Sequence, residues 1–232
     1  MEEIRQILAG LDWSPLFISI KTGIAAMIVS FFLGIWAARK VLKAKTGLRA
    51  VLDGILTLPL VLPPTVAGFF LLYVFGVKRP VGQFFLEYFS VKIAFSWGAT
   101  VLAAVVMSFP LMYRSARGAF EQVDDTLVQA ARTLGMGEWT IFRKVLLANA
   151  VPGVVSGGVL AFARGLGEFG ATAMIAGNIA GKTRTLPMAV YSEVAAGNME
   201  AACSYVAIIV MIAFLSVFLM NGVMWYSQKK SR

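Results

Sequence analysis

The sequence predicts an all-α membrane protein with about five transmembrane helices, or six. Three observations support this fold class. Of the 232 residues, 59% are hydrophobic and 14% are charged, whereas soluble domains are roughly 45–50% apolar and about 25% charged. The mean hydropathy of +0.78 leaves too few polar residues to cover a soluble globule. Finally, five apolar runs are each long enough to cross about 30 Å of hydrocarbon as a helix.

The composition also removes several kinds of active site. The sequence has no histidine, so imidazole bases and histidine metal ligands are excluded. The single cysteine, Cys203, cannot form an intrachain disulfide. No carboxylates are paired at a spacing suited to catalysis, so an intramembrane enzyme lacks a site. We therefore expect no catalytic residue, no metal ligand and no cofactor bound by this chain.

The runs predict the helices in order along the chain. Four runs contain at most one charged residue each, whereas the fourth in order is longer and contains Arg164 and Glu168. An aromatic stretch, residues 78–92, follows the second run and suits an outer interfacial or re-entrant helix. The runs cover residues 16–38, 51–77, 93–113, 145–181 and 201–226.

Basic residues are distributed unequally among the loops. Five follow the first run, five follow the third and three lie in the C-terminal tail, whereas six lie in the loops on the other side. Because lysine and arginine accumulate on the cytoplasmic side, the N-terminus is expected outside and the C-terminus in the cytoplasm. The first run follows Glu2 and Glu3 rather than a basic cluster, so we expect no cleavable signal peptide. The excess positive charge reflects topology, and no nucleic-acid partner is expected.

One loop, residues 121–148, has a helical pattern that the other loops lack. Its apolar residues recur at spacings of three and four, and two short helices separated by a glycine would form a compact knob. The apolar stripe needs a cover, which could be the chain's own helix ends, the membrane surface or another protein. The expected ends are Asp124 or Asp125 and Gly135 for the first helix, and Gly137 or Glu138 for the start of the second.

This loop resembles the cytoplasmic signature of the membrane subunits of ABC importers: Glu-Ala-Ala, three residues, Gly, nine residues, Ile, one residue, Leu-Pro. Gln129 and Val145 are conservative departures from it, whereas Ala148 replaces a proline and leaves the junction with the next helix open. The matching positions are Gln129, Ala130, Ala131, Gly135, Val145, Leu147 and Ala148.

The resemblance implies a role for this loop. In the family, the knob docks into a cleft on a separate ATPase subunit and transmits its closure to the pore. The residues expected to couple this chain to an ATPase are Gln129, Ala130, Ala131, Leu134, Gly135, Met136, Trp139 and Phe142.

The resemblance extends over most of the chain and is most specific to molybdate permeases. It implies the type I importer permease fold, with a single transmembrane domain at residues 1–232 and a coupling loop at residues 121–148. It also implies a second copy of the chain, two cytoplasmic ATPase subunits that hold ATP and magnesium, and an extracytoplasmic substrate-binding protein. The expected function is passage of an oxyanion, best matched by molybdate, across the inner or plasma membrane.

Other functions stay open. Sulfate and tungstate permeases share parts of the same motifs, so the anion is less specified than the family. A self-sufficient secondary transporter or channel would need its own ion-coupling groups and usually an inverted repeat, and we find one intramembrane charge pair and no repeat.

Prolines and charges inside the runs indicate where the transported anion is expected to cross the membrane. The three prolines of the second run should break the helix, and free backbone groups at that depth are tolerated only beside protein or a water-lined cavity. A kink packed on a neighbouring helix is the alternative. The two charged residues of the fourth run are four residues apart and can pair on one helix face. The pair could offer a positive charge to the transported anion or to a gate, or it could be a structural ion pair that locks the helix. The expected path or gate residues are Pro59, Pro63, Pro64, Ser108, Arg164 and Glu168.

Overall fold

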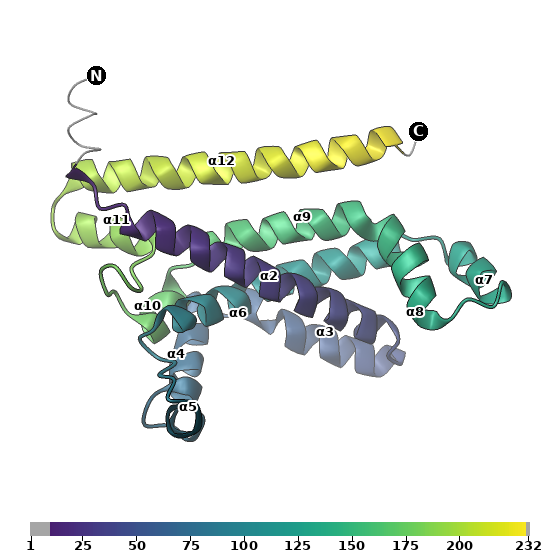
Figure 1. The fold of residues 1–232 in the computed structure, drawn as a ribbon, viewed down its shortest axis with the longest axis horizontal. Helices are drawn as coiled ribbons and strands as arrows, with labels where there is room; N and C mark the ends of the chain where they lie inside the picture. Colours follow the sequence, from purple (N-terminus) through teal and green to yellow (C-terminus); the bar gives the residue numbers. More distant parts are fainter. Residues whose placement is uncertain (1–9, 231–232) are drawn as a thin grey trace.

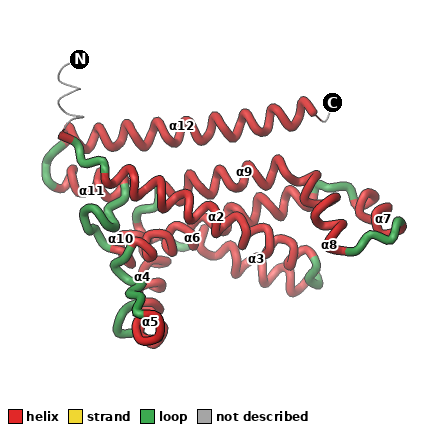
Figure 2. Tube along the Cα trace, viewed as in Figure 1, coloured by secondary structure: helices red, strands yellow, loops and turns green. Residues whose placement is uncertain are grey.

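The computed structural model describes residues 10–230, and this part of the chain is helical without strands. Long helices lie roughly along one axis, and short helices gather at the two ends of the bundle (Figures 1 and 2). Glu2 and Glu3 lie outside the described residues. The helices are α2 (Ser14–Leu42), α3 (Thr46–Val61), α4 (Pro64–Phe75), α5 (Pro80–Phe89), α6 (Trp97–Glu121), α7 (Asp125–Thr133), α8 (Glu138–Ile141), α9 (Leu147–Leu166), α10 (Gly170–Ala176), α11 (Leu186–Ala195) and α12 (Met199–Lys230).

The centre of the bundle consists of α2, α6 and α9, which pack on one another. Glycines allow α9 to approach α6 closely. A Cβ atom at Gly153 would lie 2.6 Å from Ala119 Cβ, and one at Gly157 would lie 2.6 Å from Ser115 Cβ. Lipid supplies no hydrophobic drive between helices, so close van der Waals contact between small residues holds them together.

Buried hydroxyl pairs join α2 to α6. Thr22 Oγ1 lies 3.1 Å from Thr100 Oγ1, and Ser30 Oγ lies 2.9 Å from Ser108 Oγ. All four side chains are buried, so each pair satisfies groups that water cannot reach. The structure thus gives Ser108 a place in the packing of two helices, and its expected role on the path stays a prediction.

The number of spans agrees with the expectation. Within residues 10–230, four helical segments are long and apolar enough to cross a membrane, or up to five if α3 and α4 are one broken span. The predicted break is confirmed between Val61 and Pro64, where the chain bends by 108°. Pro63 and Pro64 have no N–H to continue the helical ladder. Pro59, by contrast, lies inside α3.

The fourth run differs from the prediction of one segment over residues 145–181. Helix α9 ends at Leu166, and residues 167–169 separate it from α10. Glu168 therefore lies between helices rather than on a helix face with Arg164. Closely spaced glycines weaken the helix here. In the third run, by contrast, α6 continues through Pro110.

The aromatic stretch after α4 forms a short helix, α5, which projects from the bundle (Figure 1). The rings of Phe84 and Tyr88 contact each other at a tilt, with centroids 4.8 Å apart, and Tyr88 is 74% exposed. A helix at this position was predicted, and its location at a membrane surface remains a prediction.

The break in the second span contacts the break in the fourth. A Cβ atom at Gly68 of α4 would lie 2.6 Å from Ala171 Cα of α10. A Cβ atom at Gly170 would lie 2.9 Å from Pro64 Cβ. The backbones of α4 and α10 are thus in direct contact, and α10 fixes the position of α4.

The substitution Gly68→Ala should destabilise the protein, because its Cβ would overlap the backbone of Ala171. Overpacking of this kind costs about 1–3 kcal/mol. The matched change Gly54→Ala has no atom within 4 Å of the new Cβ and should be neutral or stabilising by about 0.5–1 kcal/mol. Thermal unfolding in detergent micelles measures both, and equal midpoints for the two variants would contradict the close contact.

Candidate coupling site and translocation path

The loop after α6 folds into two short helices, as predicted, and we call residues 124–142 the knob. The carboxylate of Asp124 accepts a hydrogen bond from the Thr126 N–H at 2.9 Å, at the start of α7. This bond stabilises the charged carboxylate and holds the pKa of Asp124 below its ordinary value of 3.8. Of the two expected caps, Asp124 is therefore the one used, and Asp125 lies in the first turn.

Gly135 ends α7, as the sequence predicts. It has a left-handed backbone, with a φ of 74°. Its N–H donates to the Arg132 carbonyl at 2.9 Å, and the Met136 N–H donates to the Ala131 carbonyl at 3.1 Å. This pair of bonds is a Schellman motif, which satisfies the last carbonyls of the helix and reverses the chain.

The second helix of the knob continues into the bundle. Helix α8 starts at Glu138, and a five-residue π-helical turn, Phe142–Leu146, links it to α9. The Leu147 N–H donates to the Phe142 carbonyl across this turn. The junction that Ala148 left open is therefore helical, and α8 is rigidly joined to α9.

The eight residues expected to couple to an ATPase fall into an outer and an inner group. Leu134 is 80% exposed and Trp139 is 57% exposed. Ala131 and Phe142 are buried, and Phe142 packs into the central core of the bundle. The outer group presents apolar side chains to the surroundings, which is typical of a docking surface. Gln129, Ala130 and Gly135 are also exposed, and Met136 is half-buried.

Arg39, at the end of α2, fixes the inner side of the knob. Its guanidinium lies 4.3 Å from the centroid of Phe142 and 4.7 Å from that of Trp139. Phe120 of α6 meets Phe142 edge-on, at 5.8 Å between centroids. A cation over aromatic faces adds attraction to the apolar contact, so α2 and α6 both anchor α8.

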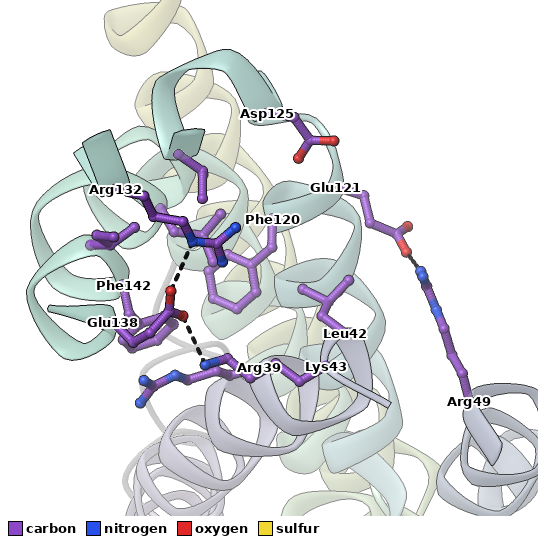
Figure 3. Close-up of a pocket in the computed structure, with 13 residues that line it drawn as sticks. Arg39, Leu42, Lys43, Arg49, Phe120, Glu121, Asp125, Arg132, Glu138 and Phe142 are labelled. Carbon is purple, nitrogen blue, oxygen red and sulfur yellow. Dashed lines mark hydrogen bonds and ion pairs between the residues drawn. The ribbon is translucent and has the colours of Figure 1, made fainter. Parts of the chain in front are cut away.

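Glu138 connects three parts of the chain. Its carboxylate lies 3.1 Å from Lys43 Nζ at the end of α2 and 2.9 Å from Arg132 Nε of α7 (Figure 3). The bond with Glu138 raises the pKa of Arg132 above its ordinary value. About half of each side chain is exposed, so each ion pair alone contributes little to stability. Their geometry instead sets how α7 and α8 lie on α2.

These contacts surround a hollow of about 410 Å³ between the knob and the ends of α2, α3 and α6. Arg49 of α3 reaches across one side to Glu121 of α6 (Figure 3). The expected coupling residues did not include Arg39, Lys43, Arg132 or Glu138. The i to i+6 spacing of Arg132 and Glu138 carries a weak local signal, whereas Lys43 is 95 residues from Glu138 and has none.

The residues expected on the path lie in two places. Pro64 meets Gly170 of α10 at the break between α3 and α4, and Pro63 precedes it. Arg164 and Glu168 lie at the break after α9, just before Gly170 in the chain. Pro59 and Ser108 lie elsewhere, inside α3 and between α2 and α6.

The charged pair is present, with a geometry that the spacing alone did not predict. Arg164 Nη1 lies 2.7 Å from Glu168 Oε2, and the other carboxylate oxygen of Glu168 accepts from the Ala171 N–H at 2.8 Å. Glu168 is 1% exposed. It therefore caps α10 while it neutralises Arg164, and this locks the orientation of α10 relative to α9.

The change Gly135→Ala should destabilise the knob by about 1 kcal/mol, because an L side chain disfavours a positive φ. Gly137→Ala is the matched control, since Gly137 has a φ of −65° and no atom within 4 Å of the added Cβ. Hydrogen exchange of residues 125–141 measures the effect. Equal protection in both variants would mean that the Schellman turn does not stabilise the knob.

Comparisons with known proteins agree with this architecture. The model of the family described as "Binding-protein-dependent transport system inner membrane component" matches residues 30–232. The chain is 41% identical over 226 residues to the molybdenum transport system permease protein ModB of Escherichia coli K12, covering 97% of this chain and 99% of that protein. It is 33% identical over 203 residues to the sulfate transport system permease protein CysT of Salmonella typhimurium, covering 86% and 73%.

The fold matches solved structures as well. A structure of inward-facing conformations of the MetNI methionine ABC transporter has a TM-score of 0.68 to this chain at 18% identity, covering 98% of this chain and 99% of that one. The permease-like sequence signature, the helical spans and the family match agree with one another. The chain belongs to the family of binding-protein-dependent transport system inner membrane components.

Proposed function

We propose that this chain is the membrane-spanning permease subunit of an ATP-driven importer of molybdate. The observation that carries this proposal is the 41% identity to a molybdenum permease along almost the whole of both chains. The knob adds independent support, because its exposed tip and ordered base suit the docking of another protein. The chain itself would hydrolyse no ATP, and the energy would come from a separate ATPase subunit.

The proposed orientation places the α7 end of the bundle in the cytoplasm. Figure 1 locates this end, where α2 and α6 finish, α3 begins and the knob lies. The concentration of basic residues at this end fits the positive-inside rule. A substrate-binding protein would then meet the opposite end, near α10 and α11. The basic residues concerned are Arg39, Lys40, Lys43, Lys45, Arg49, Arg114, Arg117, Arg132, Arg143 and Lys144.

A second copy of the chain would cover the face formed by α3 and α4. None of the 16 residues of α3 is buried. Its apolar residues Val51, Ile55 and Val61 are 58%, 61% and 82% exposed. We propose that the path runs between the two copies along this face, past the broken spans, and that two ATPase subunits bind the two knobs.

The broken spans suit the passage of an oxyanion. The break at Pro63 and Pro64 and the break at Glu168 are in contact, so movement of either would change the same region. Discontinuous helices often form the substrate region of membrane transporters. In this proposal the Arg164–Glu168 pair orients α10 at the gate.

The sulfate permease relative supports a second candidate substrate, and tungstate resembles molybdate closely in charge and shape. Uptake of radiolabelled molybdate by the reconstituted complex, with tungstate and sulfate as competitors, tests the choice. We expect molybdate uptake that requires ATP and that excess sulfate does not abolish. Preferential uptake of sulfate would identify sulfate, instead of molybdate, as the substrate. Saturable flux through the chain alone would contradict the proposal of an ATP-driven importer.

Leu134→Glu should weaken binding of the ATPase subunit about tenfold or more, because it places a charge at the apolar tip of the knob. Leu134 contributes little to folding, since it is 80% exposed. Gln122→Glu is the matched control, because it adds the same charge at an exposed residue of the same end of the bundle, outside the knob and outside α3. Co-purification and titration of the ATPase measure the effect, and equal affinity in both variants would exclude this tip from the interface.

Arg164→Gln should reduce uptake about tenfold while the complex still assembles, because the pair would no longer hold α10 at the gate. Arg164→Lys keeps the charge and should retain more uptake. Size-exclusion chromatography and uptake are measured on the same preparations. Failure of both variants to assemble would instead assign the pair to structural locking alone.

A further inference from the structure

Helix α3 is attached to the bundle by a single face. Its residues are all at least partly exposed, yet Leu52 and Leu56 pack against the central core. Arg49 and Asp53 lie on the same face, because residues spaced by three and four share one side of a helix. The face that fastens α3 thus alternates charged and apolar residues.

The charged residues of this face form a ladder with α6. The Tyr113 hydroxyl donates to one oxygen of Asp53, and Arg117 pairs with the other. Arg117 Nε also lies 3.0 Å from Glu121 Oε1, which pairs with Arg49. We call these five residues the ladder; Figure 3 shows its outer rung, Arg49 and Glu121.

The ladder is a connected network, not a set of separate surface pairs. Arg117 and Asp53 each have 24% of their side chains exposed, and Tyr113 is fully buried. A hollow of about 400 Å³ adjoins them, lined also by Thr57 and Arg114. A charged group near hydrocarbon is tolerated where it is paired and faces a cavity. Such a network resists separation more than an isolated exposed pair does.

Helix α4 is held by different neighbours from α3. It contacts α10 through Gly68 and Gly170 at backbone distance, and both helices pack on the first half of α6, around Ala103. Helix α3 instead packs on the half of α6 that ends at the knob. The chain bends by 108° between α3 and α4, at Leu62 and Pro63, so movement of α3 relative to α4 is taken up at this bend.

The ladder also lies next to the knob. Glu121 is the last residue of α6, and residues 122–124 separate it from α7. We infer that the ladder is a strut that makes α3 move with the knob and with the end of α6 that leads into it, so that docking at the knob changes the angle between α3 and α4. This inference rests on the proposed function, and it assigns Asp53, Tyr113, Arg117, Glu121 and Arg49 as positioning residues for transport.

A distance measurement that requires no transport tests whether the ladder attaches α3 to α6. Spin labels on cysteines at positions 61 and 122, in a Cys203→Ser background, report the distance between the end of α3 and the end of α6. Both positions are exposed. We expect a narrow distance distribution in lipid nanodiscs, broadened by Asp53→Asn but not by Glu87→Gln, which removes an exposed carboxylate of α5. An unchanged distribution in Asp53→Asn would overturn the strut.

The coupling role is tested in the reconstituted complex of permease, ATPase and binding protein. Asp53→Asn should lower the number of anions transported per ATP hydrolysed about fivefold or more, with assembly unchanged. Glu87→Gln should keep the wild-type ratio. If Asp53→Asn does not assemble, Arg49→Gln, at the more exposed outer rung, takes its place. An unchanged ratio in an assembled ladder variant would overturn the inference.

A covalent cross-link between α3 and α6 distinguishes two roles of the ladder. A strut holds the two helices together throughout transport, whereas a latch must open during transport. In a Cys203→Ser background, cysteines at positions 53 and 117 joined by a short bifunctional thiol reagent should restore the transport ratio. Arrest of uptake by the cross-link would overturn the strut, because α3 and α6 would then have to separate. If the wild-type complex shows no ATP-dependent uptake, the proposed function fails, and the spin-label distances still decide whether the ladder holds α3.

Discussion

The close crossing of α6 and α9 is the contact on which the rest of the structure depends. Gly153 and Gly157 allow the two helices to meet at a distance that any larger residue would prevent. Helix α6 leads into the knob and bears the partners of α3, whereas α9 continues from the knob to the pair that orients α10. The two helices thus connect the exposed docking tip to both broken spans, although lipid provides no hydrophobic drive for their association.

Several charged residues within the described spans have specific partners. Asp53 meets Arg117, Arg164 meets Glu168, and the Lys21 ammonium lies 4.1 Å from the ring centroid of Trp97. An unpaired charge at the centre of the bilayer would cost about 2.5–3.5 kcal/mol on insertion scales. Each of these charges is therefore retained together with a specific contact, and each contact joins neighbouring turns or different helices.

The features that the sequence predicts well are local. Asp124 and Gly135 were recognisable because a cap and a helix end depend on neighbouring residues, and the spans follow from length and hydropathy. The junction between α9 and α10 was missed, because its position depends on Glu168 reaching the Ala171 N–H and on contact with α4. The family signature located the knob, but the contact of Phe142 with Phe120 and the Lys43–Glu138 pair are tertiary features. No spacing rule connects residues that far apart.

The π-helical turn at Phe142–Leu146 sets the rotational phase of the knob. A hydrogen bond that spans five residues instead of four adds one residue to the helix, and one residue corresponds to about 100° of rotation. Without it, the side of α8 that bears Trp139 would point about a quarter-turn away from Arg39 and Phe120. The surface that this chain offers to a partner is therefore specified by a single extra residue in an otherwise continuous helix, far from the membrane-embedded breaks that it would control.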